Sequence, residues 1–222
     1  MQNSKMGKIV IPLVVWIFSC FGCATTMEWE QARPVSLAKP DVIVPLTDAI
    51  SKKDTLCIAP FSGHNMSQEW LNKISREYGN AVIKRNIVGF SRHIEFYRND
   101  LHIFLQEAKK IGCSVLLYGK VAKISPTGGG QTQGIMLETW IWKIPENVSI
   151  MHLKQSGFSR PGGSRDWFWS SSVGKPAAPL ASIVHRLAEQ FADILRKESK
   201  RIAKSREKLE KDSLKSVVGT NE

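Results

Sequence analysis

Hydrophobic positions in residues 54–195 alternate between strand-like runs and helix-like stripes. Short apolar runs bounded by turn residues are typical of buried strands. Apolar side chains that recur every three or four residues form one face of a helix. We predict strands over 54–61, 93–98, 113–121, 135–144 and 148–158, and helices over 66–82, 100–111 and 180–195.

This order, β-α-β-α-β-β-β-α, predicts a single α/β domain with a mixed sheet and helices packed on it. Asn99 or Asp100 suits the N-cap of the second helix, and Gly112 suits its stop. The stripe over 180–195 is the strongest periodic signal in the chain.

The N-terminal residues have the pattern of a secretory signal. Lys5 and Lys8 precede an apolar run over 9–18 that is shorter than the roughly 20 residues of a membrane span. The run ends at Ile17-Phe18-Ser19-Cys20, which resembles a bacterial lipobox. We therefore predict a lipoprotein signal peptide over 1–19, with covalent diacylglycerol and an N-acyl chain on Cys20.

Cys23 is the alternative lipidation site, because the small residue Gly22 precedes it; the signal would then run to residue 22. An ordinary secretory signal with incidental cysteines is the remaining alternative. Radiolabelled palmitate incorporated into Cys20→Ser and Cys23→Ser variants distinguishes these possibilities.

Two segments flank the predicted domain. Residues 20–53 contain three prolines, and the charges of residues 24–53 cancel. This composition predicts a lipid-anchored tether. The apolar segment 42–44 is an edge strand or linker, and we favour linker. Residues 196–222 carry nine basic and five acidic residues, which indicates a solvated helical or disordered tail. Contact with anionic lipids or acidic envelope polymers is the alternative.

Three segments of the domain carry a family resemblance: 54–61 as an opening strand, 96–98 as a strand ending in Arg, and 108–121 as a helix-Gly-strand-Gly unit. They resemble the α/β domain shared by the TolB N-terminal region, the curli-secretion lipoprotein (CsgG-like) and the lipoprotein activators of penicillin-binding proteins. The resemblance implies an adaptor or assembly role in the bacterial envelope and no catalysis.

No motif for catalysis, cofactor or metal binding is convincing. Phosphate-cradling glycine motifs and metal-ligand spacings of His and Cys are absent from the sequence. Ser172 and Ser205 each begin an S-x-x-K, without the companion motifs of penicillin-recognising enzymes. Cys57 and Cys113 lie in apolar strands, where we favour buried free thiols. A disulfide between neighbouring first and third strands is the alternative.

Aromatic residues offer the best candidates for binding. Trp140 and Trp142 share one face of a strand, and we favour packing beneath a helix over a contact surface. The Gly/Ser-rich loop 159–179 contains a cluster with the composition of interface hot spots. We predict that it binds a protein partner through Arg160, Arg165, Trp167, Phe168 and Trp169.

Together these features predict a non-enzymatic lipoprotein of the outer membrane, on its periplasmic side, that binds an envelope protein in assembly or export. Homo-oligomers are compatible with this role. The alternatives are a subunit of an oligomeric secretion channel and a cell-wall-modifying enzyme or its regulator. The net charge of +11 does not indicate nucleic-acid binding, since an exported protein does not meet chromosomal DNA.

Overall fold

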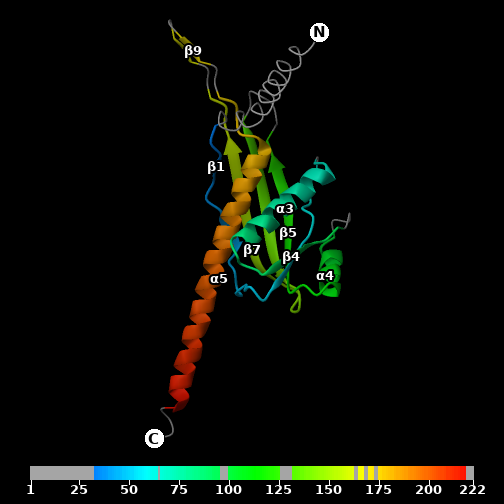
Figure 1. Cartoon of the computed structure of the whole chain (residues 1–222), viewed down its shortest axis with the longest axis vertical. Helices are drawn as coiled ribbons and strands as arrows, with labels where there is room; N and C mark the ends of the chain where they lie inside the picture. Colours follow the sequence, from blue (N-terminus) through cyan, green and yellow to red (C-terminus); the bar gives the residue numbers. More distant parts are fainter. Residues whose placement is uncertain are drawn as a thin grey trace, which may run out of the picture.

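The computed structural model describes residues 33–64, 66–95, 100–125, 132–162, 165–167, 170–172 and 175–218 (Figure 1). The predicted signal peptide, Cys20 and Cys23 lie outside this part. The strands are β1 Ser36–Leu37, β2 Asp41–Val44, β3 Thr55–Ile58, β4 Phe90–His93, β5 Val115–Ile124, β6 Gln133–Lys143, β7 Val148–Ser159, β8 Arg165–Trp167 and β9 Ser170–Ser172. The helices are α3 Gln68–Lys84, α4 Leu101–Lys110 and α5 Leu180–Val218.

A seven-stranded mixed sheet forms the centre of the molecule, in the order β1-β7-β6-β5-β3-β4, with β2 also paired to β7. β3 runs parallel to β4 and β5, whereas β5, β6 and β7 form an antiparallel meander. This arrangement confirms the predicted α/β class and places the first and third predicted strands side by side. Position 119 of β5 must be glycine for Phe61 to pack on the strand, because a Cβ there would lie 2.2 Å from the Phe61 ring.

Polar residues cap both α3 and α4, and the cap of α4 is one of the two that we predicted. Ser67 caps α3 by accepting a hydrogen bond from the Trp70 amide, and Asp100 caps α4 by accepting one from the His102 amide. Gly112 adopts a φ of 76° directly after α4, which is the left-handed conformation that glycine tolerates best. β4 ends at His93, earlier than the predicted strand over 93–98, and residues 96–99 lie outside the described part.

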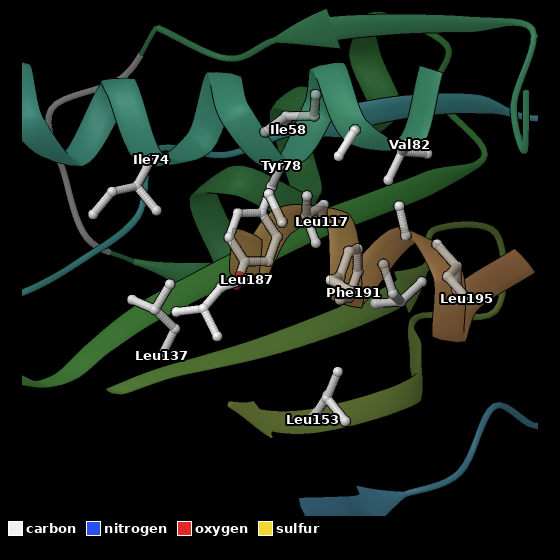
Figure 2. Close-up of a cluster of buried hydrophobic side chains, with 14 of the residues drawn as sticks. Ile58, Ile74, Tyr78, Val82, Leu117, Leu137, Leu153, Leu187, Phe191 and Leu195 are labelled. Carbon is white, nitrogen blue, oxygen red and sulfur yellow. The ribbon is translucent and has the colours of Figure 1, made fainter. Parts of the chain in front are cut away.

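α3 and α5 cover one face of the sheet and enclose the main core (Figure 2). Tyr78 of α3 and Phe191 of α5 are fully buried with ring centroids 5.2 Å apart. The Tyr78 hydroxyl donates to Gln155 Oε1 of β7 at 3.1 Å, and Gln155 Nε2 donates to Gln190 of α5 at 2.8 Å. Burial raises the pKa of Tyr78 well above its usual range, so its hydroxyl stays a donor in this network.

α4 covers part of the opposite face and forms a smaller core with β3 and β5. Cys57 and Cys113 lie in this core and form a disulfide with a Cα–Cα distance of 5.8 Å. The interpretation as free thiols was therefore wrong. Parallel pairing of β3 with β5 brings together two cysteines that are 56 residues apart in the sequence.

Residues 36–50 do not form the free tether that we predicted. β1 and β2 pair antiparallel with β7, and the segment 42–44 is strand rather than linker. Leu46 and Ile50 then enter the main core with 3% and 6% of their surfaces exposed. The prolines interrupt the strands at this edge of the sheet without preventing their pairing, since Pro is tolerated at edges.

α5 extends the predicted helix through much of the charged tail, as far as Val218. Ile202 packs against the main core, and Arg206 Nη2 lies 2.6 Å from Asp48 Oδ1. Asp48 also pairs with Lys143, which lies 3.0 Å from Glu146 in the β6–β7 turn. Residues 196–206 are therefore tied to the domain, whereas Leu209 beyond them is 70% exposed.

This ion network lowers the pKa of Asp48. Burial alone would raise it, but the Lys143 hydrogen bond and the charges of Lys143 and Arg206 outweigh burial. The same hydrogen bond, followed by that to Glu146, raises the pKa of Lys143.

Candidate functional site

The described part of the predicted partner-binding loop lies at one end of the molecule and contains a hairpin. β8 pairs antiparallel with β9, placing the backbones of Arg165 and Trp167 in the hairpin (Figure 1). The Arg160 guanidinium lies 5.4 Å from the centroid of the Phe158 ring. Phe168, Trp169 and the side chains of Arg165 and Trp167 lie outside the described part, so their role in binding stays a prediction.

The described chain begins at this same end. The Arg33 amide donates to the Pro176 carbonyl at 3.0 Å, and the Ser159 hydroxyl donates to the Arg33 carbonyl at 3.3 Å. The Gly162 amide donates to the Lys175 carbonyl at 2.7 Å. Residues just before the domain are thus fixed beside the base of the hairpin and the start of α5.

A groove of about 670 Å³ lies beside this end, between α3 and the first turns of α5. Its polar lining is mainly Arg33, Lys73, Glu77, His185 and Arg186. Glu77 Oε2 lies 3.0 Å from His185 Nδ1, so part of this charge is already paired.

A smaller polar pocket of about 210 Å³ lies where β3 and β4 end beneath α3. Arg76, His93 and Glu95 contribute its charged and titratable groups. Burial, followed by the charge of Arg76, lowers the pKa of His93, and Glu95 opposes the shift. The imidazole therefore favours its neutral form.

The face opposite α3 and α5 carries an aromatic row across neighbouring strands. Tyr118 of β5, Trp140 of β6 and His152 of β7 are partners in the strand register. The Tyr118 and Trp140 rings lie 5.6 Å apart, and Trp140 stacks on His152 at 4.4 Å with an interplanar angle of 19°. All three side chains keep some exposure. This partly exposed row was not predicted from the sequence.

Trp142 extends this surface toward α4. It packs partly against the smaller core, whereas Trp140 stacks in the aromatic row. Packing beneath a helix is thus confirmed only in part, and only for Trp142. Its Nε1 is shielded from solvent and has no hydrogen-bond partner among the residues that the structure describes.

The aromatic surface borders a cavity of about 440 Å³. In the described part of the chain, its lining residues are Asp100, Leu101, Tyr118, Trp140 and Trp142. The pattern of Trp at every second position signalled part of this surface in the sequence. Tyr118 and Asp100 gave no such signal, because only the fold brings them beside the tryptophans.

His152, in the same aromatic row, has a lowered pKa. Burial lowers the pKa of its imidazole, Glu138 opposes the shift, and Lys154 adds to it. His152 is therefore disposed to be neutral at neutral pH.

Other classes of site find little support in the described residues. Among them, no group of three or more His, Cys, Asp or Glu side chains is arranged to hold a metal ion. No helix within the described ranges has both the length and the apolar character needed to cross a membrane. Cys57 and Cys113 are joined to each other, so neither has the thiolate that a cysteine nucleophile requires.

Comparison with known proteins yields structural matches only. No family model matches the chain, and no curated protein matches its sequence. A PelC dodecamer from Paraburkholderia phytofirmans matches with a TM-score of 0.52 and 11% identity, over 73% of this chain and 97% of that one. A second crystal form, of a single-residue PelC variant, gives a TM-score of 0.50 and 10% identity over the same shares.

A lipoprotein from Neisseria meningitidis, GNA1162, also matches, with 10% identity over 63% of this chain and 96% of that one. Its TM-score of 0.39 is too low to carry an argument about this chain. The comparisons establish that the described domain has the fold seen in the PelC subunit. Assignment to the TolB and curli-lipoprotein group stays a prediction.

Proposed function

We propose that this protein is a non-enzymatic, lipid-anchored component of the bacterial envelope that assembles with copies of itself and binds a protein partner in envelope assembly or export. The observation that carries this proposal is the fold shared with PelC, a protein crystallised as a dodecamer, across 97% of the PelC chain. The lipobox-like Cys20 supports the anchor, and the outer membrane, on its periplasmic side, is the proposed location.

The end of the domain nearest the proposed anchor supports an orientation. Cys20 precedes Arg33 by 13 residues, which span at most about 45 Å when fully extended. Because Arg33 is fixed beside the β8–β9 hairpin, an anchor on Cys20 or Cys23 keeps the hairpin end toward the bilayer. The far end of α5 then points away from it.

The adaptor role is favoured over the secretion-channel alternative. A lipid-facing strand would have to come from 135–158, the region of β6 and β7. The inward-facing side chains of both strands, including Ile141 and Leu153, are fully buried beneath α5. A cell-wall enzyme gains no support from the described residues, where we find no catalytic constellation.

Palmitate labelling tests the anchor. In cells fed radiolabelled palmitate, the native chain should incorporate label and fractionate with membranes. We expect Cys20→Ser to lose the label, with Cys23→Ser as the matched control; the reverse result would assign the anchor to Cys23. Label that survives in the double variant would overturn the lipoprotein proposal.

Native mass spectrometry of the full-length chain in a non-ionic detergent tests self-assembly. We expect a discrete species containing several copies, as the PelC fold supports. A strictly monomeric chain over the micromolar range would overturn the homo-oligomer proposal without affecting the anchor.

Pull-down from solubilised envelopes tests partner binding by the hairpin. We expect a Trp167→Ala/Trp169→Ala variant to lose its partner, whereas Trp70→Ala, on α3, keeps it. Unchanged capture with lower thermal stability would show that the hairpin tryptophans are structural.

A further inference from the structure

The cavity between α4 and the aromatic surface combines aromatic walls with a carboxylate. Its three ring-bearing residues, Tyr118, Trp140 and Trp142, come from two neighbouring strands. Asp100, at the N-cap of α4, is the charged residue among the described residues of the lining. The volume of about 440 Å³ far exceeds the roughly 30 Å³ occupied by one water, so a small organic molecule fits.

The electronic character of these rings selects the sign of the ligand. The face of an aromatic ring carries partial negative charge, and Trp provides the strongest attraction for a cation above it. A cation over Trp140 or Trp142 would also be attracted by the Asp100 carboxylate. An anion in the same place would be repelled by both.

Asp100 keeps capacity for a ligand while it caps the helix. Its Oδ1 accepts a hydrogen bond from the His102 amide at 2.9 Å. Its Oδ2 has no hydrogen bond to any residue in the described ranges. The carboxylate is exposed, so an approaching cation can reach it.

The neighbouring charged side chains that the structure describes lie outside the cavity and are partly paired. Lys120, Glu138 and Lys154 form the next row across the strands, and Lys154 lies 3.6 Å from Glu138. No lysine or arginine belongs to the described lining of the cavity. His152, stacked behind Trp140, is disposed to be neutral and adds no repulsion.

Trp142 contributes its ring to the cavity and not its N–H. Its indole nitrogen is shielded from solvent, so a ligand in the solvent-accessible cavity does not reach it. Other atoms of Trp142 line the cavity and are the ones that such a ligand contacts.

We propose that this cavity binds a small organic ammonium ion, held between Trp140, Trp142 and Asp100. The cationic group lies over the indole rings and near the carboxylate. The site uses no residue of the predicted lipid anchor or of the hairpin.

Choline and its neutral isostere 3,3-dimethylbutan-1-ol test the proposal directly. They have nearly the same shape and hydroxyl but differ in charge. We would titrate each into the full-length chain in non-ionic detergent, at constant ionic strength, and follow binding by calorimetry and by the indole N–H resonances. We expect choline to bind at least tenfold more tightly and to shift the Trp142 indole signal.

Two variants assign the site. Asp100→Asn removes the charge yet keeps a good N-cap residue, and we expect it to weaken choline binding at least fivefold with α4 intact. Trp140→Ala should abolish detectable binding. Trp70→Ala is the matched control, because Trp70 lies on α3, against the other face of the sheet, and it should bind choline normally.

Several outcomes would overturn the proposal. Equal affinity for choline and the neutral isostere would mean that the cavity is merely an apolar pocket. No binding of choline up to 50-fold above the roughly millimolar range expected for such a small ligand would mean that no ammonium site exists. Equal weakening by Trp70→Ala would place the binding elsewhere.

Discussion

The two faces of the central sheet differ in what covers them. On one face, α3 and α5 bury Leu137 and Ile141 of β6 completely. On the other, Trp140 and Trp142 of the same strand keep partial exposure, and the smaller core under α4 involves β3, β5 and, of these two tryptophans, Trp142. The difference indicates that one face supplies most of the stability, which leaves the other available for binding.

Replacing a core residue beneath α5 should have the largest effect. Phe191 is fully buried against Tyr78, and truncating a buried Phe to Ala costs about 3–5 kcal/mol. We expect Phe191→Ala to lower the free energy of unfolding in urea by that amount. A loss below about 1 kcal/mol would show that α5 does not seal this face.

Removing the disulfide should weaken the face that α4 covers. A Cys57→Ala/Cys113→Ala variant frees a loop of 56 residues in the unfolded chain, and losses of about 2–4 kcal/mol are typical. Intact-mass measurement with and without reductant first verifies the bond. If dithiothreitol leaves the unfolding midpoint of the native chain unchanged, the disulfide adds nothing to this face.

Neutralising Asp48, which pairs with Lys143 and Arg206, should have a smaller effect on stability. The folded state lowers the pKa of this carboxyl below its usual value of 3.8. Its stabilisation is therefore complete above that value and is lost as pH falls through the lowered pKa. We expect Asp48→Asn to cost roughly 1 kcal/mol near pH 7 and to flatten the acid limb of the stability profile.

The opposite limb of that profile offers a check on the same network. The pKa of Lys143 is raised above 10.5, so its contribution is present below 10.5 and is lost as pH rises through the raised value. An Asp48→Asn chain with an unchanged acid limb would show that the network does not stabilise the fold.

Truncating an aromatic residue on the open face should have the smallest effect on stability. Trp140 keeps solvent exposure, so much of its surface has no apolar contact to lose. We expect Trp140→Ala to cost about 0.5 kcal/mol in urea unfolding, well below Phe191→Ala. A cost as large as that of Phe191→Ala would abolish the distinction between the two faces.

Periodicity alone predicted most of the domain. Residues of α5 such as Ile183 and Leu187 repeat at helical spacing and are fully buried. Apolar runs likewise predicted β3 and β5, because strands covered on both faces need apolar side chains on both sides.

Features that depend on pairing between distant segments were harder to predict. β2 is short and lies between prolines, so its pairing with β7 is visible only once β7 is placed. The disulfide required knowing that β3 and β5 are neighbours. The cavity depended on strand register for Tyr118 and on the α4 cap for Asp100. Neither position had a local signal of its function.

The length of α5 has a mechanical consequence. Its 39 residues make a rod of about 58 Å at 1.5 Å per residue, packed on the sheet along its first part and tied to the domain as far as Arg206. A rotation of the domain by about 10° would swing the far end of such a rod through about 10 Å. A small tilt at the hairpin end would therefore become a large displacement at the far end of α5.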